Sequence, residues 1–159
     1  MANLSTKGFR STGLSAPGFG QHPQYLLDIV QSRSLHQLIL NEAVIAATDR
    51  ALVVFEQGLR NVLYVPRADI LIPLTRKKGQ SSYCPFKGTA TYWNLEANGK
   101  ICENVGWSYD LPYDEVAPLK DHIAFYLDKL DCYWRNGIDQ PLLGPGRCHG
   151  EDCFSPIAA

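Results

Sequence analysis

The hydrophobic residues of this chain fall into short runs rich in β-branched and aromatic side chains, a pattern that is typical of strands. Residues with turn chemistry separate these runs, namely Asp49-Arg50 and Gln57-Gly58-Leu59-Arg60-Asn61. Pro66 ends the last run of the first half, because proline donates no hydrogen bond to a strand ladder. The pattern predicts successive antiparallel strands at residues 38–40, 43–46, 51–55 and 62–65.

A long central hairpin is predicted from Asn98-Gly99, since both central positions of a tight type I′ turn need positive φ. With these residues at the tip, Ala97 pairs with Lys100 and Leu95 with Cys102. Counting further back along a regular ladder sets three small or aromatic residues against three large ones. The expected pairs are Tyr92 with Val105, Ala90 with Trp107, and Gly88 with Tyr109. Alternation then puts all six on one face, with the small residues beneath the rings.

The remaining segments are predicted with less regular patterns. Pro23 suits the first turn of a helix, and Tyr25, Leu26, Ile29 and Val30 have helical spacing. We therefore expect a short helix over 24–32, a further short strand over 69–74 and a polar, cationic loop over 76–81. Residues 114–118 predict at most one helical turn before Pro118, and 122–127 predict a strand. A short helical segment is expected over 128–135, ended by Asn136-Gly137.

Length and composition indicate one mainly β domain. The 159 residues are 45% hydrophobic, which is ordinary for a single globular core. We predict a compact antiparallel β sheet or half-barrel with a short N-terminal helix and a short C-terminal helical segment. The expected boundaries are a flexible arm over 1–22, the domain over 23–137 and an irregular tail over 138–159.

The charge pattern narrows the partners and the compartment. The net charge is −1 and no basic block is present, so we expect no nucleic-acid partner. No apolar run approaches the roughly 18 residues of a membrane span, so we expect no membrane partner. The first residues lack the apolar core of a signal peptide, and five is an odd number of cysteines. These features predict a cytoplasmic protein with free thiols, the alternative being a bridge between Cys148 and Cys153.

Ordered motifs resemble a known family. Arg50-Ala51-Leu52 precedes a hairpin that ends in Tyr64-Val65-Pro66-Arg67-Ala68-Asp69. Ser82-Tyr83-Cys84-Pro85-Phe86-Lys87-Gly88-Thr89-Ala90-Thr91-Tyr92 follows, and then Trp107-Ser108-Tyr109 with Pro112, and Ala124-Phe125-Tyr126. Over residues 38–135 this order is similar to domain of unknown function 427, which some catalogues label nucleotidyltransferase-like. The resemblance implies a compact, mostly β domain and no established activity.

The residues do not support the nucleotidyltransferase label. Phosphoryl transfer generally uses metal-bound carboxylates and a phosphate cradle. The sequence contains no Gly-x-x-x-x-Gly-Lys-Ser/Thr motif and no Asp-x-Asp pair. A serine triad has no local support either, since there is no Gly-x-Ser-x-Gly.

Cys84 is the sharpest catalytic candidate. A free cysteine has a pKa of about 8.5, and lowering it to about 7 requires about 2 kcal/mol at 1.36 kcal/mol per unit. An exposed lysine supplies only about 0–1 kcal/mol, so Lys87 alone does not activate Cys84. Backbone N–H groups before Gly88 would have to help. The alternative is a buried thiol that packs as a small hydrophobe before a strand.

The leading hypothesis is a ligand pocket walled by aromatic rings. Its candidate residues are Tyr64, Cys84, Lys87, Tyr92 and Trp107. A small molecule would bind there, an anion being one option, with Lys87 supplying charge and the rings supplying apolar area. For Lys87 the alternative is a surface lysine beside a turn, and for the aromatic residues it is a place in the core.

Two further functions stay open. One is an enzyme that uses Cys84 as a nucleophile or redox centre, and the other is an interaction scaffold that uses the arm and tail. Cys148-His149-Gly150-Glu151-Asp152-Cys153 offers metal-ligand types but no paired Cys-x-x-Cys unit, so we assign no metal site. The sequence identifies no cofactor, and it leaves the oligomeric state open.

Overall fold

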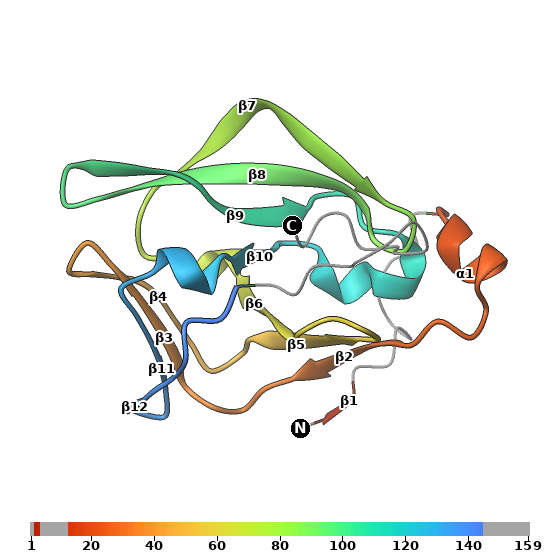
Figure 1. Ribbon diagram of the computed structural model, residues 1–159, viewed down its shortest axis with the longest axis horizontal. Coiled ribbons are helices and arrows are strands. Elements are labelled where there is room, and N and C mark those ends of the chain that lie inside the picture. The colour runs from red at the N-terminus through yellow and green to blue at the C-terminus, as the bar shows by residue number, and fades with distance from the viewer. Residues whose placement is uncertain (1, 4–12, 145–159) are drawn as a thin grey trace.

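The prediction of a mainly β, antiparallel fold is confirmed by the computed structural model of the protein, which describes residues 2–3 and 13–144 (Figure 1). The strands are β1 Ala2–Asn3, β2 Leu27–Gln31, β3 His36–Leu40, β4 Ala43–Thr48, β5 Leu52–Glu56, β6 Val62–Pro66, β7 Leu74–Cys84, β8 Gly88–Ala97, β9 Lys100–Tyr109, β10 His122–Phe125, β11 Cys132–Arg135 and β12 Ile138–Asp139. The helices are α1 Pro17–Gln21 and the 3₁₀ turns η1 Arg67–Asp69, η2 Asp114–Leu119 and η3 Leu127–Lys129.

Two antiparallel sheets make up the domain. The larger has the strand order β1-β2-β5-β6-β10-β9-β8-β7 and the smaller β12-β11-β3-β4. The large sheet curls, so that β2 and β5 lie across from β7, β8 and β9, with β6 and β10 between them (Figure 1). The small sheet lies at one end of this half-barrel, and α1 lies at the other.

The large sheet is buried on both faces along its middle strands. In β6, Tyr64 faces the first core, inside the curl, whereas Leu63 and Val65 face the second core, toward the small sheet. In β10, Ala124 faces the first core and Ile123 the second. Strands covered on both sides need apolar residues at every position, which explains the continuous runs at 62–65 and 122–127.

The central hairpin has the predicted tip but a different register toward its base. Ala97 pairs with Lys100 and Leu95 with Cys102, as expected. Beyond a bulge, however, Tyr92 pairs with Trp107 and Ala90 with Tyr109, so the predicted pairs Tyr92–Val105, Ala90–Trp107 and Gly88–Tyr109 are wrong. Tyr92, Ala90, Trp107 and Tyr109 still share the first core. Val105 belongs to the second core.

The bulge has a local cause. Between the pairs Trp93–Gly106 and Leu95–Cys102, β9 contributes the three residues 103–105 against Asn94 alone. Asn104 has φ of 53°, and its N–H donates to Asn94 Oδ1 at 2.8 Å. Asparagine tolerates the left-handed conformation found at residue 104. The Asn94 side chain accepts the hydrogen bond of the backbone N–H that the bulge leaves out of the ladder. Two extra residues therefore move Trp107 two positions along the ladder.

The helix predicted over 24–32 is wrong, because residues 27–31 form β2. This strand pairs with all of β5, from Leu27 with Glu56 to Gln31 with Leu52. The apolar residues of so short a segment fit either period. The backbone edge of β5 makes this segment a strand, since the N–H and C=O groups along that edge need hydrogen-bond partners. The N-terminal helix is α1 instead, where Gly18 packs under Phe86 and Pro85.

The cationic segment 76–81 was predicted as a loop, but it lies inside β7, the edge strand of the large sheet. Between the pairs Arg76–Trp93 and Ser81–Thr91, the four residues 77–80 stand opposite Tyr92 alone. The strand therefore arches away from β8 (Figure 1). Lys78 and Gly79 are exposed at the arch, so the segment is solvated like a loop while both ends stay paired.

Three other local predictions need correction. The helix predicted over 128–135 is wrong beyond η3, because 132–135 form β11. Asn136-Gly137 turns this strand into β12 with positive φ at both residues, like Asn98-Gly99. The strand predicted over 69–74 is wrong as well, since 70–73 contain only a bridge from Ile70 to Ala46, and β7 begins at Leu74. The turn at 114–118 extends to Leu119. The strand predicted over 122–127 is present but ends at Phe125, since Leu127 begins η3.

The boundaries of the arm, domain and tail stay predictions. Within the predicted arm, Phe19 of α1 meets the Phe86 ring edge-on at a centroid distance of 4.9 Å. The Cys148–Cys153 segment lies outside the described residues. No helix in the described part of the chain has the length and apolar character needed to cross a membrane. The cytoplasmic location likewise stays a prediction.

A buried histidine ties the small sheet together. His36 of β3 is hydrogen-bonded through Nδ1 to the Tyr133 hydroxyl at 2.9 Å and through Nε2 to Ser32 Oγ at 2.8 Å. Burial, with a smaller effect from the charge of Arg135, lowers the pKa of His36 to about 4. The folded protein thus holds a neutral imidazole at neutral pH.

This network makes the stability depend on pH. In the unfolded chain His36 takes up a proton near its ordinary pKa of 6.5, whereas in the folded chain it does so only near about 4. The free energy of unfolding is therefore expected to fall as the pH drops from about 6.5 toward about 4. Urea unfolding at pH 7 and pH 5 measures this loss. The His36→Gln variant should lose less over the same interval, and an equal loss would contradict the assignment.

Candidate functional site

The β7–β8 turn carries the central motif of the sequence and sends two side chains inward. Cys84 pairs with Gly88, and residues 85–87 form the loop between them. Gly88 has φ of 115°, and a Cβ there would lie 3.1 Å from the Leu111 carbonyl oxygen. The backbone therefore requires glycine at this position. Phe86 and Lys87 of this turn are both buried.

Lys87 forms a buried ion pair with Glu56, the last residue of β5. The ammonium donates to Glu56 Oε2, and the two side chains are only 5% and 4% exposed. Tyr25 donates its hydroxyl to Glu56 Oε1 at 2.8 Å, while its ring stacks on Phe86 at a centroid distance of 4.0 Å. The carboxylate is thus held by one charged and one neutral donor.

Aromatic rings surround this pair from β6 and β9. The Tyr64 and Trp107 rings meet edge-on at a centroid distance of 6.3 Å. Burial raises the pKa of both Tyr64 and Tyr109, so both phenols stay neutral. A cavity of about 10 Å³ remains among these groups, lined by Val54, Glu56, Leu59, Val62, Tyr64, Lys87, Trp107 and Tyr109. A space of that size holds about one water molecule.

The predicted site residues thus fall into two groups. Tyr64, Lys87 and Trp107 line the cavity. Cys84 and Tyr92 lie in the same core but do not line it, and the Tyr92 hydroxyl is hydrogen-bonded to Ser82 Oγ at 2.6 Å. Lys87 is a core residue rather than a surface lysine, and its charge is paired with Glu56.

The surroundings of Cys84 favour the neutral thiol. The side chain is fully buried, and burial raises its pKa. Lys87 and hydrogen bonds from the backbone of Phe86 and Lys87 act in the opposite direction but are smaller effects. The backbone help foreseen for a nucleophile therefore exists, but desolvation outweighs it.

Cys84 is expected to resist alkylation in the folded protein. At pH 8, iodoacetamide should label the half-buried Cys102 and Cys132 before Cys84, because alkylation needs an exposed thiolate. Peptide mass spectrometry of native and urea-unfolded samples measures the three rates. If native Cys84 is labelled as fast as in urea, the thiol is accessible, which would contradict this prediction and support the nucleophile hypothesis.

Two members of the site were missed by the sequence analysis, Glu56 and Tyr25. For Glu56 the signal was present. Leu52, Val54 and Glu56 alternate along β5 and all face inward, so the run placed a carboxylate in line with core residues. Tyr25 had no comparable signal, because it precedes β2 and reaches Glu56 only through the pairing of β2 with β5.

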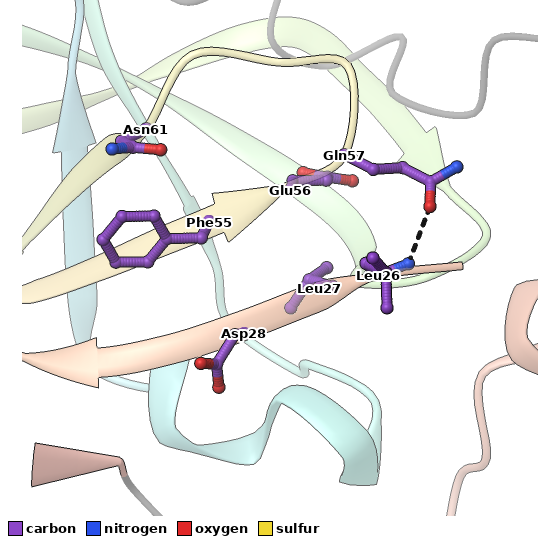
Figure 2. A pocket seen from close by; sticks show the side chains of 7 residues that line it. All are labelled: Leu26, Leu27, Asp28, Phe55, Glu56, Gln57 and Asn61. Atoms are coloured by element: carbon purple, nitrogen blue, oxygen red, sulfur yellow. Dashed lines mark hydrogen bonds between the residues drawn. The ribbon is translucent and has the colours of Figure 1, made fainter. Parts of the chain in front are cut away.

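A larger open cleft of about 430 Å³ borders the same strands (Figure 2). Its lining residues are Leu26, Leu27, Asp28, Phe55, Glu56, Gln57 and Asn61. Asp28 pairs with Phe55, and Leu27 pairs with Glu56, so the two pairs face opposite sides of the sheet. Glu56 thus borders this cleft as well as the small cavity, and its carboxylate accepts the hydrogen bond of Lys87.

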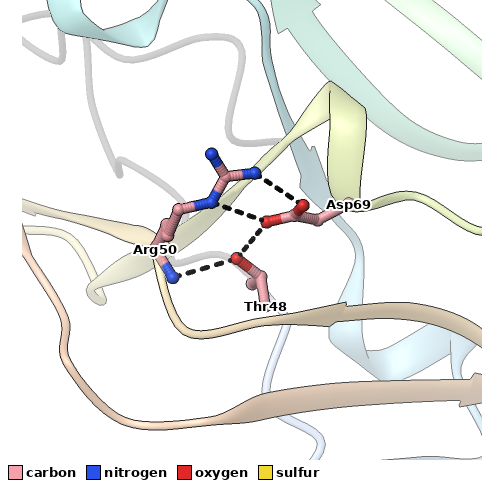
Figure 3. A network of polar contacts seen from close by, with 3 residues as sticks. All are labelled: Thr48, Arg50 and Asp69. Carbon is pink, nitrogen blue, oxygen red and sulfur yellow. Dashed lines mark hydrogen bonds and ion pairs between the residues drawn. The ribbon is translucent and has the colours of Figure 1, made fainter.

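A second polar cluster lies at the surface, where the β4–β5 turn meets η1 (Figure 3). Arg50 donates through Nε and Nη2 to Asp69 at 3.3 and 2.6 Å, and Thr48 donates to Asp69 Oδ2 at 2.6 Å. These contacts lower the pKa of Asp69. The Arg50 side chain is 56% exposed. The cluster holds the β4–β5 turn against η1. None of its residues lines the cavity or the cleft.

Across residues 13–144, no three His, Cys, Asp or Glu side chains gather closely enough to hold a metal ion. The candidate site consists of one ion pair, three phenols and an indole.

The curled antiparallel sheet, with a buried ion pair among its aromatic residues, makes this chain a small mainly β domain. A family model described as a domain of unknown function (DUF427) matches residues 28–136, and the chain belongs to that family. The match begins at residue 28, inside β2, whereas the expected resemblance began at residue 38. A comparison with curated proteins finds no match.

Proposed function

We propose that this protein binds a small molecule at the Glu56–Lys87 pair, inside the end of the half-barrel. The observation that carries the proposal is the burial of two opposite charges beside a cavity lined by Tyr64, Trp107 and Tyr109. Binding sites typically combine aromatic walls with a few convergent polar groups.

Stability alone gives a weak reason for such a pair. Removing two charges from water is expensive, and well-packed apolar residues in their place are often equally or more stable, by about 1–4 kcal/mol. The pair also borders a cavity, and a ligand in that cavity would meet two convergent charged groups. We therefore assign the pair to recognition of a ligand.

Access to the pair requires the β5–β6 turn, residues 57–61, to move. Leu59 of this turn lines the cavity and is half-buried, while Gln57, Gly58, Arg60 and Asn61 are exposed. The cavity of about 10 Å³ is far below the roughly 300–1,000 Å³ of ordinary ligand sites. The ligand takes the space that the Leu59 side chain leaves.

A thermal-shift screen of a small-molecule library tests the proposal. Hits should raise the melting temperature of the wild type but not of Tyr25→Phe/Glu56→Met/Lys87→Met, in which the polar groups are replaced by apolar ones of similar size. A ligand at 100 times its Kd stabilises by about 2.7 kcal/mol, which corresponds to roughly 5–11 °C for a domain of this size.

The matched control is Asp69→Asn, which removes a charge from the surface cluster and should keep every hit. Tryptophan fluorescence in a Trp93→Phe/Trp134→Phe background, where Trp107 is the remaining indole, reports whether a hit reaches the site. If no compound shifts the wild type, or if the triple variant keeps the same hits, the proposal is wrong.

A further inference from the structure

We infer that the ligand of this site carries one positive and one negative group side by side, as a free amino acid does. The inference rests on the proposed function and adds the charge and size of the ligand. It differs from the anionic option suggested by the presence of Lys87 in the sequence.

The charge balance of the site is the first argument. Lys87 is not a spare cation, because its ammonium is bound to Glu56 Oε2 and both side chains are almost fully buried. An anion that drew Lys87 away would leave a buried carboxylate with Tyr25 as its neutral donor. A cation that drew Glu56 away would leave a buried ammonium. Either ligand leaves one charge uncompensated in the core.

A ligand with both charges avoids this penalty. Its ammonium would bind Glu56 and its carboxylate would bind Lys87, so that four charges of alternating sign replace two. The hydrogen-bonding capacity is sufficient, because a carboxylate has about four acceptor sites and an ammonium has three donors. Tyr25 uses one acceptor site of Glu56 and can remain in place.

The size of the ligand follows from Leu59. This side chain lines the cavity beside Val54, Val62 and Trp107, and it comes from an exposed turn. When the turn moves out, the vacated space is apolar and the size of one isobutyl group. A zwitterion with a branched aliphatic side chain of that size fills the space that Leu59 leaves.

Three compounds with the same aliphatic end and different charges test the inference. Leucine carries both charges, isocaproate only the carboxylate, and isoamylamine only the ammonium. Binding is measured by isothermal titration calorimetry and Trp fluorescence on the full-length wild type and on Leu59→Gly, in which the turn no longer fills the site. Leucine should bind at least about tenfold more tightly than either analogue, and Glu56→Met/Lys87→Met should lose this preference.

The outcomes separate the inference from the proposed function. If isocaproate or isoamylamine binds as tightly as leucine, the ligand class is wrong while the site stands. If leucine binds neither the wild type nor Leu59→Gly, but a library compound binds in a manner that depends on Lys87 and Glu56, the ligand class is again wrong. If no compound of either set binds, the proposed function fails together with the inference.

Discussion

Replacing Lys87 with methionine is expected to lower the free energy of unfolding by about 3–5 kcal/mol, because it leaves the buried Glu56 carboxylate without its cation. For a domain of this length, each kcal/mol shifts the melting temperature by about 2–4 °C, so the expected loss is roughly 6–20 °C. Thermal and urea unfolding followed by circular dichroism measure both quantities at neutral pH.

The matched control removes both buried charges and keeps side chains of similar size. The Tyr25→Phe/Glu56→Met/Lys87→Met variant has no buried charge at this point and should regain most or all of the wild-type stability. If Lys87→Met alone stays within about 1 kcal/mol of the wild type, the pair is not desolvated as described. If the triple variant is as unstable as the single one, side-chain packing is the dominant contribution.

Gly106→Ala is expected to disrupt the contact of β9 with β10. A Cβ at Gly106 would lie 2.6 Å from the Ala124 carbonyl oxygen and 3.3 Å from Ile123 Cγ2. Because the closest atom belongs to the backbone of a buried strand, side-chain rotation cannot relieve the clash. Overpacking of this kind destabilises by about 1–3 kcal/mol or more. Urea unfolding measures the loss.

Gly20→Ala is the control for that substitution. It makes the same chemical change in α1, where a Cβ would have no neighbour within 4 Å. Alanine restricts the unfolded chain more than glycine does, so we expect a change between zero and a gain of about 1 kcal/mol. Equal effects of the two substitutions would mean that β9 and β10 are less closely packed than described.

The strands could be predicted from the sequence where local chemistry determines them. Asn98-Gly99 determined the tip of the central hairpin, because few residues adopt positive φ at two successive positions. The run 62–65 was recognisable because both faces of β6 are buried. In these cases the side chains themselves carry the information.

The wrong predictions of strands and register arise where residues distant in the sequence determine the local structure. Residues 27–31 form a strand because β5 offers them an edge, and no local pattern shows that edge. The register of β8 and β9 changed because Asn104 takes a left-handed conformation inside a strand. Asn136-Gly137 has the same turn signal as Asn98-Gly99, but the short flanking runs 132–135 and 138–139 did not read as strands.

The candidate site was predicted in part. Tyr64, Lys87 and Trp107 were expected to converge, and they line one cavity. The sequence could not show that Lys87 is neutralised, because Glu56 lies 31 positions away and meets it only after the sheet curls. Burial was also decisive for Cys84, since a motif reveals neighbours but not the exclusion of water.

The arch of β7 has a consequence for molecules that meet at high concentration. An exposed edge strand with regular, flat pairing invites the strand of another molecule, and continued addition leads to aggregates. Here the edge is interrupted at residues 77–80 and carries lysines. A second chain therefore finds two short, separated stretches of free backbone and a positive charge between them, which makes this border a poor template for intermolecular growth.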